Sequence, residues 1–400
     1  MLSSIFSISK QGFEESILTS LVRCRLISLT AVLAVSLSMN AVAQESSGSA
    51  HTDEAVQRQK VALIVSPKGS PLWQATTPLR AGIRAAYERV KDKYELVEFT
   101  LSEPSAVRDV LNSAADAGAM LAIGPVSKPA VQAVSELSYL PLPVVAINRA
   151  HTDRVPELML TLDMSVESEA EQLVKIALEN TASEQNAAKS FVIFTTGSDY
   201  DDKLARTIER ELAKSGVSAE RRSISPEQLS YLRQEMRGKS FRGVFFAMSA
   251  QQASLLRPYI PPELPVFGTT YTSPLHLQDR MQAKTQANDL VGMVTLELPA
   301  ETKLPLSSYS GYMKVYDKMS QEERQMFAVG IDAWQVGEQW LKWAKDFSFS
   351  ESMSGRLTYS GEDGQRVIRQ LDKAVVNPSK TGSAEEDLVQ FTEDAGDAGL

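Results

Sequence analysis

Ten positions carry residue types that could hold a small ligand, and each lies at or just beyond the carboxyl end of a segment expected to be a strand. They are Ser66, Ser70, Gly124, Ser127, Asn148, Ser198, Asp199, Ser249, Thr270 and Tyr271. Hydroxyl groups and helix N-termini can hold a carboxylate, and an acidic side chain can hold an ammonium group. Ligands of open α/β sheets bind beyond the carboxyl ends of the strands. These positions are therefore the predicted ligand-binding residues, and their chemistry suits an amino acid or a similar small molecule.

The same residue types have a second interpretation, as helix caps and turn formers. Ser, Thr, Asn and Asp supply caps and turns in any α/β protein, whether or not it binds a ligand. The acids Asp199, Asp201 and Asp202 lack the pattern of a calcium loop, and a helix dipole favours acids in the first turn. Lys68-Gly69 lacks the spacing of a phosphate-binding loop. We therefore expect no metal at these acids, and both interpretations of the ten positions stay open.

Groups that make or break bonds form no motif in this sequence. There is no Gly-x-Ser-x-Gly segment and no His-Glu pair of a metalloprotease. The chain has one cysteine, Cys24, and three histidines, His51, His151 and His276. Such a set does not suit a zinc site built from Cys and His. We predict a protein that is not an enzyme and that uses no cofactor.

Length and composition indicate how many cores the chain can fill. A chain of 400 residues is long for one small domain and suits two lobes. With 43% hydrophobic and 23% charged residues, it has the composition of a folded protein. The net charge of −9 is opposite in sign to the basic surface that nucleic-acid binding needs. Nucleic acid is therefore not an expected partner.

Residues 1–43 have the pattern of a cleaved export signal. Two arginines precede an apolar segment, and Ala41-Val42-Ala43 gives the small-x-small pattern of a cleavage site. The alternative is that this segment stays attached as an anchor, although it is short for crossing a bilayer. A lipoprotein cysteine would follow the apolar segment, whereas Cys24 precedes it. We expect a periplasmic protein without a lipid anchor, whose mature part begins with a linker over 44–58.

Beyond residue 58, strand patterns alternate with amphipathic helix patterns. The expected strands are 60–65, 96–101, 120–123, 144–147, 158–162, 191–195, 220–224, 244–248, 265–271, 355–359 and 366–371. The expected helices are 74–91, 106–117, 129–139, 166–179, 199–214, 226–236, 250–257 and 321–345. Residues 378–400 are rich in acids and are expected to be a disordered tail.

Two successive runs of this kind predict an α/β protein with two doubly wound parallel-sheet lobes, the venus-flytrap architecture of type I periplasmic binding proteins. The expected first lobe is 59–162 with 273–346, and the expected second lobe is 163–272 with 347–377. Because neither run alone supplies a full lobe, the chain is expected to cross between the lobes several times. The predicted crossings lie near Asp163, near Thr272 and near Phe347.

Several short segments, taken in order, carry a resemblance to a known family. They are Val61–Pro67, Ile123-Gly124-Pro125, Phe241–Pro299, Gly330-Ile331-Asp332-Ala333-Trp334, and Gly355-Arg356-Leu357 followed by Gly364, Ile368 and Arg369. Over most of Lys60–Val376 the chain resembles the C-terminal domain of penicillin-binding protein activators of the LpoA type. Type I binding proteins of amino-acid transporters share several of these segments, so it is their order that carries the resemblance.

The resemblance implies a function. Activators of this family are envelope proteins with a periplasmic-binding-protein fold that switch on peptidoglycan synthases. By resemblance, this chain is a non-catalytic regulator of cell-wall synthesis that binds and activates a bifunctional, class A penicillin-binding protein. The alternative is a solute-binding protein of an ABC transporter, with an amino acid or similar small molecule in the inter-lobe cleft. A sensor whose cleft ligand controls docking would combine the two.

Overall fold

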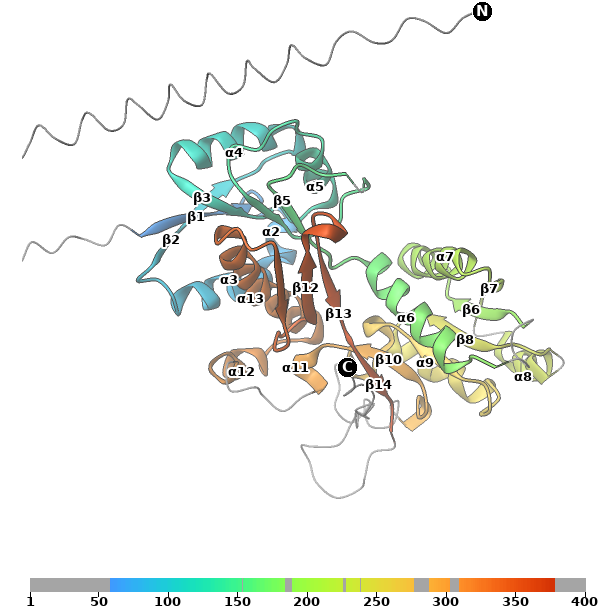
Figure 1. Cartoon of the computed structure of the whole chain (residues 1–400). Coiled ribbons are helices and arrows are strands. Elements are labelled where there is room, and N and C mark those ends of the chain that lie inside the picture. The colour runs from blue at the N-terminus through green and yellow to red at the C-terminus, as the bar shows by residue number, and fades with distance from the viewer. Residues whose placement is uncertain are drawn as a thin grey trace, which may run out of the picture. The chain divides into compact units, whose positions relative to one another are not determined.

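The computed structural model describes residues 58–377, except for 153, 184–188, 226–227, 238, 277–287 and 303–308. The described residues fall in one compact unit and form two mixed, mostly parallel sheets with helices on their faces (Figure 1). The expected export signal, nearly all of the linker and the acidic tail lie outside the described residues. Within the described ranges, no helix combines the length and the apolar character needed to cross a membrane.

The first sheet has eight strands in the order β11-β12-β13-β5-β4-β3-β1-β2. They are β1 (Gln59–Val65), β2 (Tyr94–Thr100), β3 (Ala119–Ile123), β4 (Val144–Ala146), β5 (Met159–Leu162), β11 (Asp346–Phe349), β12 (Arg356–Ser360) and β13 (Arg366–Gln370). The pairs from β13 to β2 are parallel, and β11 and β12 add an antiparallel edge. Residues 61–65 of β1 are all buried, as expected for a parallel strand covered on both faces.

Helices cover both faces of this sheet. The helices of the first lobe are α2 (Pro71–Ala75), α3 (Thr77–Glu88), α4 (Val107–Asp116), α5 (Lys128–Ser135), α12 (Ser310–Tyr316) and α13 (Gln321–Leu341). Leu63 packs in one core with α3 and α13, whereas Ile64 packs in a second core with α4 and α5. Where α3 meets α13, a Cβ on Gly82 would lie 2.1 Å from the carbonyl oxygen of Phe327. The two helices therefore approach so closely that only glycine fits at their contact.

The second sheet has six strands in the order β14-β10-β9-β8-β6-β7. They are β6 (Phe191–Thr195), β7 (Ala219–Ser223), β8 (Gly243–Ala247), β9 (Val266–Gly268), β10 (Val294–Glu297) and β14 (Asp372–Val375). All neighbours are parallel except β10 and β14. Its helices are α6 (Val166–Asn180), α7 (Asp199–Lys214), α8 (Leu229–Arg237) and α9 (Ala250–Leu256). The rings of Phe191, Phe245 and Phe267 pack together in its core.

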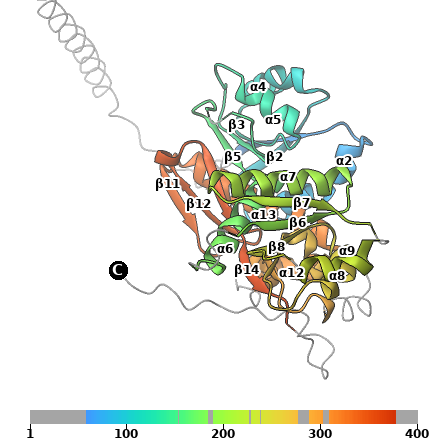
Figure 2. The ribbon, with the colours of Figure 1, turned by 90° about the vertical axis from the view of Figure 1, so that its right-hand side faces the viewer.

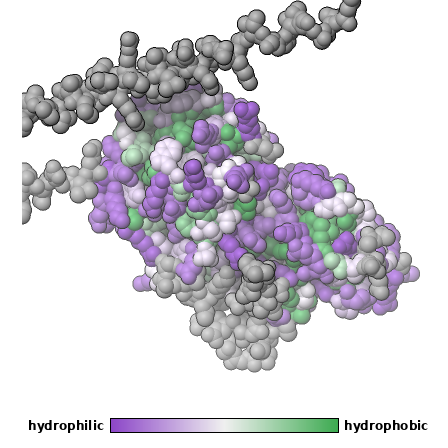
Figure 3. All heavy atoms as spheres, viewed as in Figure 1, coloured by the Kyte–Doolittle hydropathy of each residue, from purple (hydrophilic) through white to green (hydrophobic). Residues whose placement is uncertain are grey.

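Short elements connect these parts. They are α11 (Pro299–Thr302) and the 3-10 helices η1 (Pro104–Ala106), η4 (Arg257–Tyr259), η5 (Thr270–Thr272), η6 (Pro274–His276) and η7 (Gly361–Asp363). The labels in Figures 1 and 2 show β1, β2, β3, β5 and β11–β13 in one lobe, and β6, β7, β8, β10 and β14 in the other. The face drawn in Figure 3 is mainly hydrophilic over the described residues, with smaller hydrophobic areas, as expected for a surface that meets water.

The chain passes between the two sheets three times: after β5, after β10, and between β13 and β14. The crossing expected near Asp163 is present, but the other two lie near residues 298 and 371, which corrects the expected positions near 272 and 347. The segment 273–346 therefore gives β10 to the second sheet, and 347–377 gives β12 and β13 to the first. The physical reason is that β10 continues the parallel sheet beside β9, so the return to the first lobe comes later than expected.

Candidate binding site

The first candidate site is a pocket at the carboxyl ends of β1, β2 and β3, with a volume of about 380 Å³. Four residues predicted from the sequence line it, namely Ser66, Ser70, Gly124 and Ser127. Asn148 is not part of its lining, and its side-chain amide donates to the carbonyl oxygen of Val126 at 3.2 Å. The parallel strand ends therefore gather most of the first-lobe candidates at one pocket.

Local backbone chemistry accounts for three of these lining residues. Ser70 is the N-cap of α2, and its hydroxyl accepts a hydrogen bond from the amide of Trp73 at 3.1 Å. Ser127 is the N-cap of α5 and accepts from the amide three residues on at 3.4 Å. Gly124 has a φ of 103°, and a Cβ there would lie 2.9 Å from the carbonyl oxygen of Ile64. The interpretation as caps is therefore correct for both serines, although they also line the pocket.

Arg80 forms part of the wall of the same pocket. Its guanidinium lies 3.5 Å from the ring centroid of Trp73 and donates to the carbonyl oxygen of that residue at 2.7 Å. It also donates to the hydroxyls of Thr76 and Thr77, each at 3.0 Å. Burial lowers the pKa of Arg80 from its usual value. The guanidinium thus fixes α2 against the start of α3, and the sequence patterns did not indicate this role.

The second candidate site lies beside the crossings, between the two lobes, and has a volume of about 310 Å³. Its lining residues are Met164, Val166, Glu169, Tyr200, Thr270, Tyr271, Glu322, Gln325, Val329 and Arg369. Those from α6, α7 and η5 belong to the second lobe, and those from α13 and β13 belong to the first. Thr270 and Tyr271 were predicted from their position at the carboxyl end of the expected strand 265–271.

The other three candidates of the second lobe do not line either pocket. Ser198 is the N-cap of α7 and accepts from the amide of Asp201 at 3.2 Å. Asp199 lies in the first turn of α7, where the helix dipole favours an acid. Ser249 forms a capping box with Gln252 at the start of α9. All three residues thus act at helix starts, and Ser249 also forms a side-chain hydrogen bond with Tyr271 of the second pocket.

Two tyrosines form one wall of the second pocket. The rings of Tyr200 and Tyr271 meet edge to face, with centroids 4.9 Å apart and planes at 73°. Burial raises the pKa of both hydroxyls, with Asp201 and other acids nearby adding to the effect. Both phenols are therefore neutral hydrogen-bonding groups at physiological pH.

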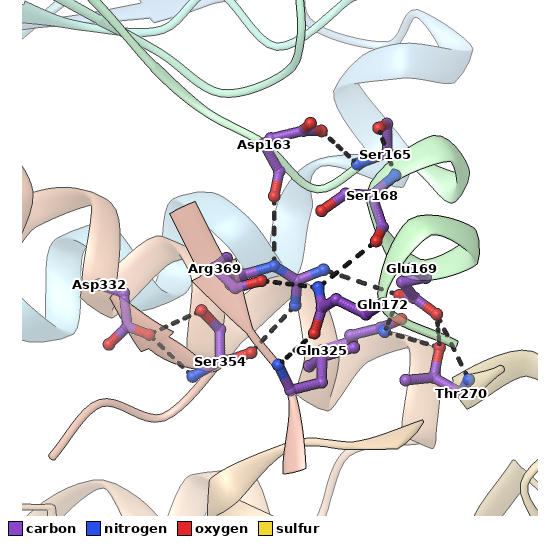
Figure 4. A network of polar contacts seen from close by, with 11 residues as sticks. Asp163, Ser165, Ser168, Glu169, Gln172, Thr270, Gln325, Asp332, Ser354 and Arg369 are labelled. Atoms are coloured by element: carbon purple, nitrogen blue, oxygen red, sulfur yellow. Dashed lines mark hydrogen bonds and ion pairs between the residues drawn. The ribbon is translucent and has the colours of Figure 1, made fainter. Parts of the chain in front are cut away.

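Glu169 links the lobes at the floor of this pocket (Figure 4). Its Oε2 accepts from the Thr270 hydroxyl at 2.8 Å, and its Oε1 lies 3.6 Å from Nη2 of Arg369. The side-chain amide of Gln325 donates to the Thr270 hydroxyl at 3.1 Å. Glu169 and Thr270 belong to the second lobe, whereas Gln325 and Arg369 belong to the first. One hydrogen-bonded cluster therefore holds both lobes in register.

Arg369 is the centre of this cluster, and its side chain is 1% exposed. Besides Glu169, its guanidinium donates to the carbonyl oxygens of Asp163 at 3.2 Å and Ser354 at 2.9 Å. Asp163, at the first crossing, accepts from the amide of Ser165 and forms an ion pair with Arg366. A buried guanidinium with carbonyl and carboxylate partners is held firmly, because leaving any of these groups unpaired would cost free energy.

Asp332 extends the cluster into the first lobe. Its Oδ2 accepts from the amide and the hydroxyl of Ser354, each at 2.7 Å, and its Oδ1 accepts from the amide of Met353 at 3.2 Å. Burial raises the pKa of Asp332 to about 6, although these hydrogen bonds and Arg369 favour the charged form. Asp332 thus fixes the loop that presents Ser354 to Arg369.

Sequence patterns did not predict Glu169, Gln325 or Arg369 as members of the site. Glu169 and Gln325 lie inside helices rather than at strand ends, and Arg369 lies within β13. The only signal was the presence of Arg369 and Asp332 in the segments that carry the family resemblance. In the described part of the chain, no three His, Cys, Asp or Glu side chains gather as metal ligands would. The two pockets can hold small molecules by hydrogen bonds, charge and aromatic contact.

Comparisons with known proteins show which solved structures share this fold. No protein-family model matches the chain, and no curated protein matches it in sequence. A structure described as a putative branched-chain amino acid ABC transporter from Chromobacterium violaceum matches with a TM-score of 0.63 and 20% identity, covering 80% of this chain and all of that one. The LpoA C-domain from Haemophilus influenzae, described as a regulator of PBP1A, matches with a TM-score of 0.60 and 15% identity, covering 80% of this chain and 98% of that one.

The chain therefore has the fold of type I periplasmic binding proteins, as the sequence predicted. Full-length LpoA from Haemophilus influenzae matches with a TM-score of 0.62 and 15% identity, and the match covers 58% of that protein. This fold is shared by LpoA and by proteins described as amino-acid ABC transporters, and it is typical of periplasmic proteins. At identities this low, the likeness establishes the architecture and not the function.

Proposed function

We propose that this protein is a non-catalytic periplasmic regulator of peptidoglycan synthesis that binds and activates a bifunctional, class A penicillin-binding protein. The ordered family segments support the proposal, as does the likeness to the LpoA C-domain. The observation that favours a regulator over a transport protein is that hydroxyl groups near the strand ends cap helices. Ser70, Ser127, Ser198 and Ser249 all accept hydrogen bonds from their own helices, so their contribution to a ligand is reduced.

A reconstituted synthesis assay tests this proposal. The purified protein is added to class A penicillin-binding proteins from the same organism, and glycan polymerisation and peptide crosslinking are measured with labelled lipid II. We expect direct binding to one of these synthases and a faster reaction in the presence of the protein. Failure to bind any of them, or binding without any change in rate, contradicts the proposal.

The second candidate function is solute binding for an ABC transporter. It is favoured by the inter-lobe pocket, where Glu169, Tyr200 and Tyr271 could surround an ammonium group. A ligand at 100 times its Kd stabilises a protein by about 2.7 kcal/mol, which is visible as a rise in Tm. A thermal-shift panel of amino acids and related metabolites therefore tests this function, and an unchanged Tm across the panel contradicts it.

A further inference from the structure

Three charged side chains from both lobes converge, and two of them are chain neighbours of residues that line the candidate pockets. Lys128 is the first residue of α5 in the first lobe, and Glu167 lies in the first turn of α6 in the second. The Nζ atom of Lys128 lies 3.1 Å from Oε2 and 3.2 Å from Oε1 of Glu167. Lys203 of α7, also in the second lobe, places its Nζ atom 3.4 Å from Oε1. One carboxylate thus bridges a lysine from each lobe.

The cluster of Lys128, Glu167 and Lys203 lies next to segments that line the two pockets. Ser127, next to Lys128 in the chain, lines the first pocket, and Val166, next to Glu167, lines the second. The side chains of Lys128 and Glu167 are 31% and 21% exposed, so the pair is only partly screened by water. The contacts around Glu169 and Arg369 also join the lobes, and they lie beside the crossings.

Glu167 is charged over a wide pH range, so its contact with Lys128 does not depend on the pH. Burial alone would raise the pKa of Glu167, but hydrogen bonds from its own backbone and from Lys128, together with the charge of Lys203, lower it to about 2. Glu167 therefore carries its charge throughout the physiological pH range. The contact depends on the distance between the lobes and not on a titration near neutral pH.

We propose that Lys128 and Glu167 form an electrostatic latch that holds the two lobes closed over the cleft, with Lys203 anchoring the carboxylate from its own lobe. Opening the cleft separates Lys128 from Glu167, whereas Lys203 stays with Glu167 because both belong to the second lobe. The latch acts on the cleft between the lobes and goes beyond the proposed function, because it is a property of the free protein. A test that needs neither ligand nor synthase therefore distinguishes its failure from failure of the proposed function.

The distance between spin labels on the two lobes measures how far the cleft is open, and so tests the latch. The full chain with Cys24→Ser carries labels at Asp109→Cys in α4 and Gln251→Cys in α9, two exposed positions on different lobes. We expect a narrow, short distance distribution for this parent protein. Lys128→Met should increase the population at longer distances about threefold, and Lys128→Glu about tenfold, because the second change adds repulsion.

Lys203→Met is the matched control, since it removes a charge from the same carboxylate without crossing the cleft. It should not increase the long-distance population. A high salt concentration should widen the distribution of the parent and change that of Lys128→Met much less. Circular dichroism verifies that each variant is folded. If Lys128→Glu does not fold, Lys128→Met alone tests the proposal. The proposal is overturned if both Lys128 variants match the parent, or if Lys203→Met opens the cleft equally.

Discussion

The buried side chain of Glu297 predicts how the free energy of unfolding changes with pH. It ends β10 just before a crossing, is 1% exposed, and receives a hydrogen bond from the Thr295 hydroxyl at 3.0 Å, while its Oε2 accepts no hydrogen bond from the residues that the structure describes. Burial raises the pKa of Glu297 to about 8, with the hydrogen bonds of Ser273 and Thr295 acting in the opposite direction. The carboxyl group is therefore neutral in the native protein at pH 7.

The sign of the pH dependence follows from this shift. A carboxyl whose pKa is higher in the folded state than in the unfolded one binds its proton more tightly when folded. The free energy of unfolding therefore falls as the pH rises from the unfolded pKa of 4.5 to about 8, and is then constant. Between pH 6 and pH 8 this loss is about 2 kcal/mol. Asp332, another buried acid, has a pKa of about 6 and contributes mainly below this window.

The substitution Glu297→Gln tests the argument, because glutamine has nearly the shape of the neutral acid and cannot ionise. Urea unfolding at pH 6, 7 and 8 should show the variant gaining stability relative to the wild type, by about 2 kcal/mol over the window. Glu263→Gln, at an exposed loop position, is the control and should leave the pH dependence unchanged. Parallel pH profiles for Glu297→Gln and the wild type would refute the reasoning, since they would mean that Glu297 is ionised in the native state.

Three further predictions concern stability and are checked by chemical denaturation. Arg369→Met leaves the carboxylate of Glu169 without its buried partner and should destabilise the protein by about 3–5 kcal/mol; a loss below 1 kcal/mol would contradict the role of the guanidinium. Gly330→Ala places a Cβ 2.2 Å from the carbonyl oxygen of Leu79 and should cost about 2–3 kcal/mol, although alanine is the better helix former; a gain in stability would contradict the close helix contact. Ser320→Ala removes the capping box of α13 and should cost about 1 kcal/mol, whereas Ser320→Thr should retain most of it.

Local periodicity allowed much of the fold to be predicted. The strand 191–195 and the helix 199–214 have the predicted bounds, because a fully buried apolar run and an amphipathic stripe behind a serine cap are strong local signals. The strand β10 was not predicted, because it is short and carries Thr295 and Glu297 in buried positions. Its omission also misplaced the second crossing, since membership of a sheet depends on pairing between distant segments.

The candidate site was predictable only where strand ends determine it. Ser66 and Thr270 line pockets because parallel strands end at one edge of each sheet. The cluster around Glu169 and Arg369 was not predictable, because these two residues are 200 positions apart in the sequence and meet only through the crossings. The sequence shows that a charged residue is present, but not that it will be buried against its partner.

The strands β13 and β14 follow one another directly, over Arg366–Gln370 and Asp372–Val375, and each belongs to a different sheet. Without β13, the eight-stranded sheet has no strand to join β5 to β12. Without β14, the six-stranded sheet lacks one of its edge strands. Synthesis proceeds from the amino end, so both sheets stay incomplete until residues 366–375 have left the ribosome. The two sheets are thus completed by the same short stretch of chain, and not one after the other.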